Sequence, residues 1–304
     1  MPTALCRMLG ISVPILQAPM TFIANADLAA AVSNAGGLGV IETASPGGRA
    51  DLQRVRQLTD RPVGANVALA MVRDPAVVDI IAAAGIGVVT TSAGDPALLT
   101  DRLHEAGITV FHVVGSLRMA LKARDAGVDG LVVEGVEGGG FKHALGASTM
   151  VVLPLVAGEV DLPIVAAGGI CDGRSMAAAF ALGAEGVQMG TRMLASVESP
   201  VHAAFKQAIV DADEMGTVLV SIPGRPTMRV IRTEAAMHAA AAGESPVGLD
   251  RVSDLYFGGD LEASLANTGQ VAGRIADVRP VAEILDEMWR DCRIALDDAR
   301  TRLV

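Results

Sequence analysis

The sequence predicts an α/β fold, a (β/α)8 TIM barrel with a small C-terminal cap segment, from three observations. Short apolar runs rich in β-branched residues alternate with Ala-rich helical patterns, which is typical of βα units around a parallel sheet. Eight such runs can be counted, and most of the helical patterns between them end in Gly, as helices often do. Hydrophobic residues make up 51% of the chain and aromatic residues only 3%, so aliphatic side chains must build the core.

The eight candidate strands follow one another through the first two thirds of the chain. Their ranges are 14–20, 38–42, 63–69, 87–94, 109–115, 130–135, 163–169 and 186–192. A barrel of this kind carries its functional residues at the C-terminal ends of the strands. A doubly wound open sheet is the alternative, but it usually carries G-x-G-x-x-G after its first strand.

The βα rhythm divides the chain into three segments. Residues 1–212 carry the rhythm and form the expected ligand-binding barrel. Residues 213–274 contain Gly and Pro breaks and predict irregular chain with a helix, organised as a cap or lid. Residues 275–304 have helical spacing and are expected to pack back on the barrel as a C-terminal helix.

Charge and cysteine content restrict the partners and the compartment. A formal net charge of -10, without a Lys/Arg cluster, disfavours nucleic acid. Cys6, Cys171 and Cys292 lie far apart without a CxxC motif, so neither a zinc site nor a disulfide framework is expected. The sequence has no basic-then-apolar leader and no apolar run near the ~20 residues of a spanning helix. We therefore expect a cytoplasmic protein without a membrane segment.

The strand ends predict a phosphate-bearing ligand. AAGGICDGR and QMGTR follow the seventh and eighth strands, the loops with which barrels often bind phosphate through backbone N–H groups. This pattern leaves flavin mononucleotide, sugar phosphates and nucleotides open. PILQAPM, at the first strand, is suited to placing backbone polar groups against a flat polar ring, and Asn66 can both donate and accept at such an edge.

Several motifs in order resemble one family almost from end to end. They are PILQAPM, AAAVSNAGGLGVI, GANVAL, EGVEGGG, LPIVAAGGICDGR, GAEGVQMGTRML with ESPVH, and GQVAG at 269–273. The family is that of the nitronate monooxygenases, also called 2-nitropropane dioxygenases, with the related flavin-dependent enoyl-acyl-carrier-protein reductases.

This resemblance implies an FMN-binding TIM barrel whose flavin is partly covered by a small C-terminal domain. By position, the residues that would line or edge the isoalloxazine are Ala18, Pro19, Met20 and Asn66. Those expected along the ribityl chain and phosphate are Gly139, Ala167, Gly168 and Gly169. Those at the phosphate end and from the cap are Gln188, Gly190, Thr191 and Gln270. No metal site is expected.

The chain departs from the family pattern in EGGGFKH, residues 137–143. Family members usually carry a histidine, taken as the substrate's base, where this chain has Phe141. A phenyl ring cannot transfer protons, so three candidates for this task are left open. Lys142 replaces the histidine, a loop shift brings in His143, or His112 acts while Phe141 only shapes the pocket.

Two enzymatic functions and one non-enzymatic function remain open. The preferred one is reduction of an activated C=C, with NADH or NADPH as electron donor and an acyl thioester as candidate substrate. The second is oxidation of alkyl nitronates with oxygen. The third is a flavin-binding paralogue without turnover. A small-molecule substrate is expected in both enzymatic cases, and a homodimer is the candidate assembly.

Overall fold

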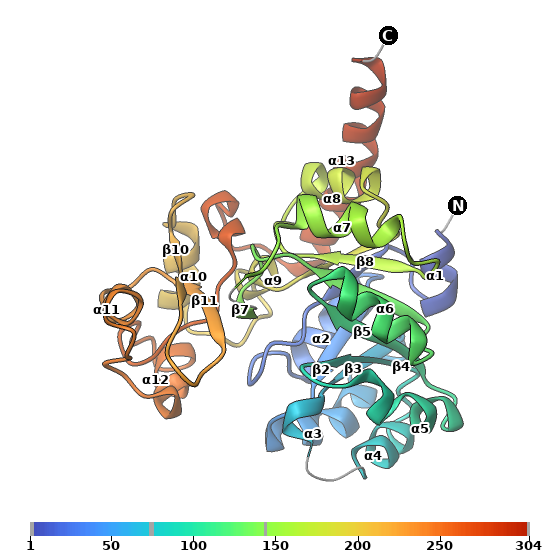
Figure 1. Cartoon of the computed structure of the whole chain (residues 1–304), viewed down its shortest axis with the longest axis horizontal. Helices are drawn as coiled ribbons and strands as arrows, with labels where there is room; N and C mark the ends of the chain where they lie inside the picture. Colours follow the sequence, from blue (N-terminus) through green and yellow to red (C-terminus); the bar gives the residue numbers. More distant parts are fainter. Residues whose placement is uncertain (1–2, 73–75, 143–144, 303–304) are drawn as a thin grey trace.

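The computed structural model describes residues 3–72, 76–142 and 145–302, and its main sheet is a barrel of parallel strands (Figure 1). The eight strands are ordered β1-β9-β8-β6-β5-β4-β3-β2. Each lies inside one of the eight predicted ranges, so the TIM-barrel prediction is confirmed. Their bounds are β1 (Ile15–Gln17), β2 (Gly39–Glu42), β3 (Val63–Ala68), β4 (Val88–Ser92), β5 (Thr109–Val114), β6 (Gly130–Glu134), β8 (Ile164–Ala167) and β9 (Gly186–Met189).

The barrel closes between β1 and β2 through a single bridge and one side chain. Leu16 and Leu38 form an isolated parallel bridge there. The carboxamide of the fully buried Gln17 donates to Val40 O at 3.0 Å and accepts from Val40 N at 3.2 Å. A glutamine amide has the donor and acceptor of a peptide group, so Gln17 completes the ladder where the strands do not pair regularly.

Helices follow the strands and surround the barrel, and several begin at side-chain caps. Ser45, Ser116 and Asp172 each accept a backbone N–H of the following first turn, which satisfies donors that a helix start leaves free. The helices are α1 (Ala4–Leu9), α2 (Ala26–Asn34), α3 (Pro46–Arg54), α4 (Val77–Ala83), α5 (Thr100–Glu105), α6 (Leu117–Asp125), α7 (Thr149–Ala157), α8 (Gly173–Ala181), α9 (Thr191–Leu194), α10 (Ala203–Val210), α11 (Glu234–Ala242), α12 (Val252–Tyr256) and α13 (Val281–Thr301).

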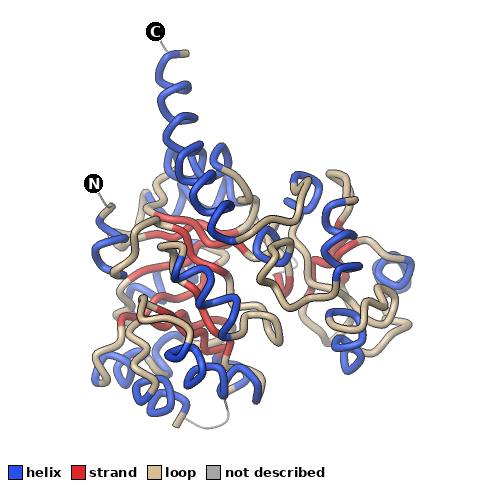
Figure 2. Tube along the Cα trace, turned by 180° about the vertical axis from the view of Figure 1, so that it is seen from behind, coloured by secondary structure: helices blue, strands red, loops and turns tan. Residues whose placement is uncertain are grey.

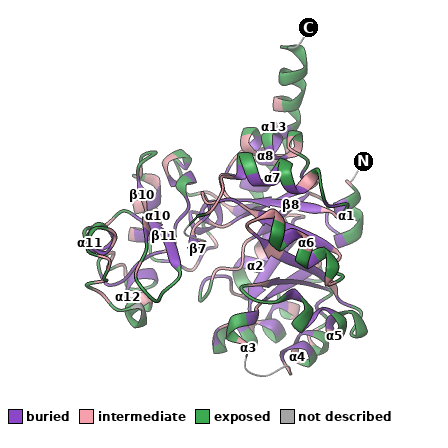
Figure 3. Cartoon of the chain, viewed as in Figure 1, coloured by how far each residue is buried: buried purple, intermediate pink, exposed green. Residues whose placement is uncertain are grey.

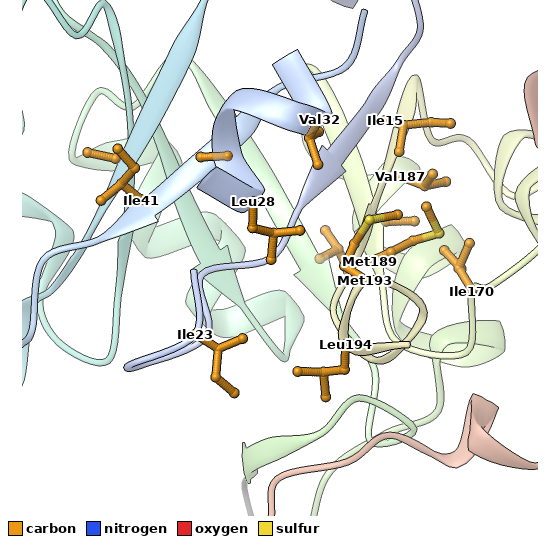
Figure 4. Close-up of a cluster of buried hydrophobic side chains, with 14 of the residues drawn as sticks. Ile15, Ile23, Leu28, Val32, Ile41, Ile170, Val187, Met189, Met193 and Leu194 are labelled. Carbon is orange, nitrogen blue, oxygen red and sulfur yellow. The ribbon is translucent and has the colours of Figure 1, made fainter. Parts of the chain in front are cut away.

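Successive strand residues divide between two hydrophobic clusters, which shows the direction of each side chain. Ile15, Val187 and Met189 belong to the large cluster between strands and helices and gather with Leu28 and Val32 of α2 (Figure 4). The members of the second cluster, inside the barrel, include Leu16, Val40, Val88, Phe111, Val132, Val165 and Ala167. Because side chains alternate along a strand, this division identifies the inward-facing positions.

The N-terminal helix closes the bottom of the barrel. Leu5, Cys6 and Leu9 of α1 are buried and belong to the inner cluster. A Cβ on Gly186 would lie 2.4 Å from Leu5 Cδ2, so the missing side chain makes room for this plug. The packed bottom leaves the C-terminal ends of the strands as the open side of the barrel.

Residues 213–274, here called the cap, contain two strands where the sequence predicted irregular chain. β10 (Thr217–Val220) and β11 (Thr227–Ile231) form an antiparallel hairpin. β7 (Gly140–Lys142), from the loop after β6, joins β11 as the third strand of this sheet. The cap sheet and its helices lie beside the barrel (Figure 2), and β7 is a direct connection between the two.

The last helix packs on the barrel through its first half. Its buried residues are Val281, Ile284, Leu285, Met288 and Cys292, with the three-to-four spacing of a helix face. The second half of α13 extends away from the barrel and is largely exposed (Figure 3). In the part of the chain that the structure describes, no helix is both long enough and apolar enough to cross a membrane.

Candidate active site

The inward-facing positions become polar at the C-terminal ends of the strands. On β3, Ala65 and Val67 face the helices, so Asn66 between them faces inward. The same alternation directs Glu134 on β6 and Gln188 on β9 into the barrel. Glu134 pairs with Ala167 and Ala167 pairs with Gln188 in the strand register, so these residues form one layer at the barrel mouth.

Gln188 has unused hydrogen-bonding capacity. The residue is only 6% exposed, and its Oε1 has no hydrogen-bond partner among the described residues. A buried polar atom without a partner is costly, and such atoms in native proteins are usually satisfied by water or a ligand. Gln188 therefore offers an acceptor to a ligand inside the mouth.

Asn66 is held by its neighbours on β4. Its Nδ2 donates to the backbone and side-chain oxygens of Thr90, both at 2.9 Å. Among the residues that the structure describes, its Oδ1 has only a 3.5 Å contact, with Ser92 Oγ. The donors of Asn66 are thus used to fix the amide, and its oxygen is the atom left for a ligand edge.

The segment after β1 lies against the loop after β9. A Cβ built on Gly190 would be 3.6 Å from Ala18 Cβ and 3.8 Å from Met20 Sδ, and Ala18 N donates to Met189 O at 2.8 Å. Pro19 lies between Ala18 and Met20 in the chain. The structure therefore brings these predicted isoalloxazine and phosphate-end residues together.

The glycine loops after β6 and β8 pack backbone against backbone. Gly168 and Gly169 have φ angles of 86° and 78°, which favour glycine. A Cβ on Gly168 would be 2.9 Å from Gly135 O, and one on Gly139 would be 2.9 Å from Gly269 N. These glycines allow close approach within the protein itself, which the sequence pattern alone did not distinguish from close approach to a ligand.

The cap segment around Gln270 is anchored on these loops. Gln270, at the start of the 3-10 helix Gln270–Arg274, donates its backbone N–H to Glu137 O at 2.9 Å, while its side chain is exposed. Gly269 N donates to the buried Thr191 Oγ1 at 2.9 Å. Thr191 thus uses its hydroxyl oxygen to hold the cap over the loop after β9.

Each of the three glycines in EGGGFKH, Gly138 to Gly140, occupies a position where a side chain would clash or strain the backbone. A Cβ on Gly138 would lie 2.4 Å from Glu134 Oε1, and Gly139 faces the cap backbone. Gly140 has a φ of 79°, in the left-handed region that residues with a Cβ rarely adopt. The triplet therefore carries the chain past Glu134, under the cap and into β7.

Lys142 lies at the barrel mouth as part of an ion pair. Its Nζ donates to Glu134 Oε1 at 2.8 Å, to Gly139 O at 3.0 Å and to Phe141 O at 3.2 Å. Its side chain is only 6% exposed. All three ammonium donors are engaged, so an atom that accepts a proton from Lys142 must replace one of these partners.

Phe141 and Lys142 point to opposite faces of the cap sheet. Phe141 lies directly opposite Met228, so both side chains share the face of the cap's small hydrophobic cluster, which contains Met228. Phe141 is nevertheless 58% exposed because β7 is the edge strand. Lys142 takes the other face, toward Glu134 and the barrel.

His112, the second proton-transfer candidate, faces the helices and not the barrel interior into which Glu134 points. His112 lies between Val110 and Val114 in the layer between strands and helices, with Nδ1 2.8 Å from Thr91 Oγ1. Burial lowers the pKa of His112 to about 4, although the charge of Asp95 acts to raise it. Its role in catalysis stays a prediction. His143 lies outside the described residues.

Arg229, on strand β11 of the cap, is a structural residue. It is buried, its Nε donates to Val136 O at 2.9 Å, and its Nη1 donates to Thr217 Oγ1 at 3.2 Å. Burial lowers the pKa of Arg229, while the charge of Glu137 raises it. Arg229 links the cap to the loop after β6. Arg232, by contrast, is exposed and lies 3.5 Å from Asp213.

Two further carboxylates have structural roles. Glu137 caps a helix. Glu42, which the sequence did not single out, connects two loops through hydrogen bonds. Glu137 accepts from the backbone and hydroxyl of Thr149 at the start of α7. Glu42 is buried and accepts from backbone groups of the loops after β1 and β2. Among the residues with described positions, no group of three His, Cys, Asp or Glu side chains could hold a metal ion.

The family model for nitronate monooxygenase matches residues 2–76 and 70–291. The chain belongs to this family. The resemblance in the sequence motifs is thereby confirmed, and with it the expectation of an oxidoreductase enzyme of this family.

Individual members of the family are similar over most of the chain. One is a (3aS,4S,5R,7aS)-5-hydroxy-7a-methyl-1-oxo-octahydro-1H-indene-4-carboxyl-CoA dehydrogenase of Mycobacterium tuberculosis, 36% identical over 76% of the chain, which spans 66% of that relative. Another is a nitronate monooxygenase of Pseudomonas aeruginosa, 32% identical over 79% of the chain and 83% of the relative. The solved structure of FabK from Thermotoga maritima is 36% identical and covers 99% of both chains with a TM-score of 0.89.

Proposed function

We propose that the chain is an FMN-dependent oxidoreductase that uses NADH or NADPH to reduce an activated C=C bond of a small molecule. The observation that carries this proposal is Phe141, at the position where the resemblance implies a basic histidine. Nitronate oxidation by the family's route needs that base. Reduction needs a proton donor instead, and a lysine at the mouth can supply it.

The relatives support a thioester as the substrate class. The Mycobacterium tuberculosis relative is named for a carboxyl-CoA substrate. FabK belongs to the enoyl-acyl-carrier-protein reductases that the sequence motifs resemble. An acyl thioester is the feature that both names have in common, and in the proposed reaction its carbonyl would activate a conjugated C=C.

The residues at the mouth fit FMN. Within the described part of the chain, Gln188 offers a buried acceptor without a partner, and Asn66 Oδ1 faces inward with one long contact. Gly190 leaves the space beside Ala18 and Met20 free of a side chain. We assign the flavin edge to Asn66 and the isoalloxazine surface to the segment Ala18–Met20.

The remaining predicted contacts complete this cofactor site. Gly139, Ala167, Gly168, Gly169, Gln188, Gly190 and Thr191 would hold the ribityl chain and phosphate, and Gln270 would reach the flavin from the cap. When bound, FMN supplies the hydride-transfer chemistry that the protein side chains lack.

Lys142 is the proposed proton donor. Its ammonium is held beside the inward-facing Glu134, and little solvent reaches it. Exclusion of water keeps the proton of Lys142 for the substrate, and Glu134 fixes the direction of one N–H. The substrate carbonyl or carbanion would take the place of Gly139 O or Phe141 O as acceptor.

Nitronate oxidation is the second candidate, favoured by the Pseudomonas aeruginosa relative of that name. A flavin-binding protein without turnover is the third, because Phe141 removes the family's base. The experiment is to reconstitute the purified chain with FMN and compare two assays: NADH or NADPH consumption with trans-2-butenoyl thioester, and oxygen uptake with propyl-2-nitronate. Turnover in the first assay supports the proposal; oxygen uptake with nitronate alone supports the second candidate. A yellow protein inactive in both supports the third.

A further inference from the structure

A cavity lies between the barrel rim and the cap, beside the site described above. Its volume is about 230 Å³. It is lined from the loop after β1, the end of β2, the first turns of α3 and the end of α12 by Phe22, Asn25, Glu42, Ser45, Pro46, Gly47, Gly48, Asp51 and Phe257. Phe22 follows Met20 by two residues, so the cavity adjoins the proposed isoalloxazine surface.

The Glu42 carboxylate and the Ser45 hydroxyl of this cavity already have partners within the protein. Glu42 accepts from the backbone N–H groups of Phe22, Ala44 and Ser45, and from the Ser45 hydroxyl. Ser45 Oγ in turn accepts from Gly48 N at 3.0 Å. A polar ligand group would find these acceptors and donors occupied.

The charge of the lining excludes anions. Its ionisable members are two carboxylates, Glu42 and Asp51, and no Lys, Arg or His is among its described residues. A phosphate or carboxylate in this space would be repelled and left without a counterion. The nucleotide part of a coenzyme therefore does not suit this cavity.

Two aromatic rings remain free to contact a ligand. Phe22 from the barrel is 48% exposed and Phe257 from the cap is 40% exposed. Phe22 has a φ of 68°, in a region that bulky residues rarely adopt, and such backbone strain clusters at ligand-binding sites. The Phe22 ring is thus held at the edge of this cavity by a backbone conformation that costs free energy.

We propose that this cavity binds the apolar acyl chain or ring of the substrate, between Phe22 and Phe257. The inference rests on the proposed function, since it names the part of the thioester that determines specificity. A volume of about 230 Å³ is below the ~300–1,000 Å³ of pockets that enclose a whole drug-sized ligand, so the cavity takes one end of the substrate. The thioester end then lies toward the barrel mouth.

The test uses N-acetylcysteamine thioesters of trans-2-butenoate and trans-2-decenoate, which carry no nucleotide. For the FMN-reconstituted enzyme, we expect kcat/KM for the ten-carbon substrate to exceed that for the four-carbon one. Phe257→Ala should lower this ratio about tenfold, as expected for lost apolar contacts in a specificity pocket. Met237→Ala is the matched control, because Met237 is also apolar, half-exposed and in the cap.

A filling variant tests the cavity without removing a ring. A Cβ on Gly47 would meet only Ser45 Oγ, at 3.7 Å, so Gly47→Leu can enter the cavity without a backbone clash. It should depress turnover of the ten-carbon substrate and spare the four-carbon one. Calorimetric titration of both thioesters into wild-type and variant enzyme gives a binding readout independent of turnover.

The outcomes separate this inference from the proposed function. Turnover of both thioesters with a ratio unchanged in Phe257→Ala and Gly47→Leu would overturn the cavity assignment and leave the reductase standing. Chain-length-dependent binding that both variants weaken, without any turnover, would support the cavity and reject the reductase. If the two variants instead raise the KM for NADH or NADPH and leave the ten-carbon to four-carbon ratio unchanged, the cavity binds the nicotinamide coenzyme, and the assignment to the acyl chain is overturned.

Discussion

Lys142 Nζ lies 2.8 Å from Glu134 Oε1, and this ion pair joins the end of barrel strand β6 to β7, the strand that pairs with the cap. The pair lies where the family pattern is broken, one residue after Phe141. It connects a proton-bearing group to an inward-facing position of the barrel. Most consequences of the proposed function depend on this relationship.

Replacement of Lys142 tests its role as proton donor. Lys142→Ala should retain flavin absorbance and lose turnover by about 10²-fold or more, the usual contribution of a positioned acid. Glu134→Gln keeps a hydrogen-bond acceptor for Nζ and should lose less. The measurement is steady-state kcat, with the flavin content determined on the same samples. Unchanged turnover in Lys142→Ala would dismiss Lys142 as a catalyst.

Gly138→Ala should separate the ion pair by steric contact. A Cβ there would be 2.4 Å from Glu134 Oε1, whereas one on Gly87 meets nothing within 4 Å. We expect Gly138→Ala to lower Tm and turnover together, while Gly87→Ala leaves both close to wild type. Tm from thermal unfolding and steady-state kcat are measured for both variants. Equal Tm and kcat in Gly138→Ala and Gly87→Ala would reject the assigned role of Gly138.

Arg229→Met should weaken the attachment of the cap. The substitution leaves Val136 O without its 2.9 Å donor, and a hydrogen bond to a charged group contributes about 1.5–3 kcal/mol. Arg232→Met removes only an exposed pair, worth about 0–1 kcal/mol. Denaturant unfolding measures the free energies of unfolding. A larger loss in Arg232→Met would contradict the described contacts.

His112 should make the protein acid-sensitive without serving the reaction. Burial lowers the pKa of His112 from its ordinary 6.5 to about 4 in the folded protein, so the unfolded chain binds more protons between these pH values. The free energy of unfolding should fall by about 3 kcal/mol as pH drops from 6.5 to 4, and stay constant for this group above 6.5.

The matched variant is His112→Asn, whose amide can retain the bond to Thr91 Oγ1. It should remove this part of the pH dependence of stability and keep wild-type kcat at pH 7. Urea unfolding across the pH range, with kcat alongside, tests both points. Loss of turnover in a folded His112→Asn protein would instead return His112 to the list of proton donors.

The barrel was predictable because its signals are local. Each strand shows as an apolar run, and each helix shows as an Ala-rich pattern between two strands. β10 and β11 form a local hairpin, but the Pro and Gly of its connection, SIPGRP, predicted irregular chain. β7 was missed because Gly140–Lys142 becomes a strand only through pairing with Thr227–Arg229, more than eighty residues away. Such pairing leaves no periodic signal in either segment.

The candidate site was predictable in part for the same reason. Motif order gave the residues at the strand ends, but not the side-chain direction of His112. TVFHVV is apolar on both faces, since a parallel strand is buried on both, so no alternation in the sequence shows that His112 faces the helices. The partners of Lys142 likewise depend on the path of the glycine triplet.

In the proposed function, a nicotinamide coenzyme, and not a nitronate, delivers electrons to the flavin of this protein. Anaerobic mixing of the FMN-reconstituted protein with NADH or NADPH, followed by flavin absorbance, distinguishes the two electron donors. The proposed function predicts bleaching with at least one of the two, and recovery of the absorbance on adding a trans-2-enoyl thioester. A flavin that stays oxidised with both coenzymes but bleaches with propyl-2-nitronate would contradict it.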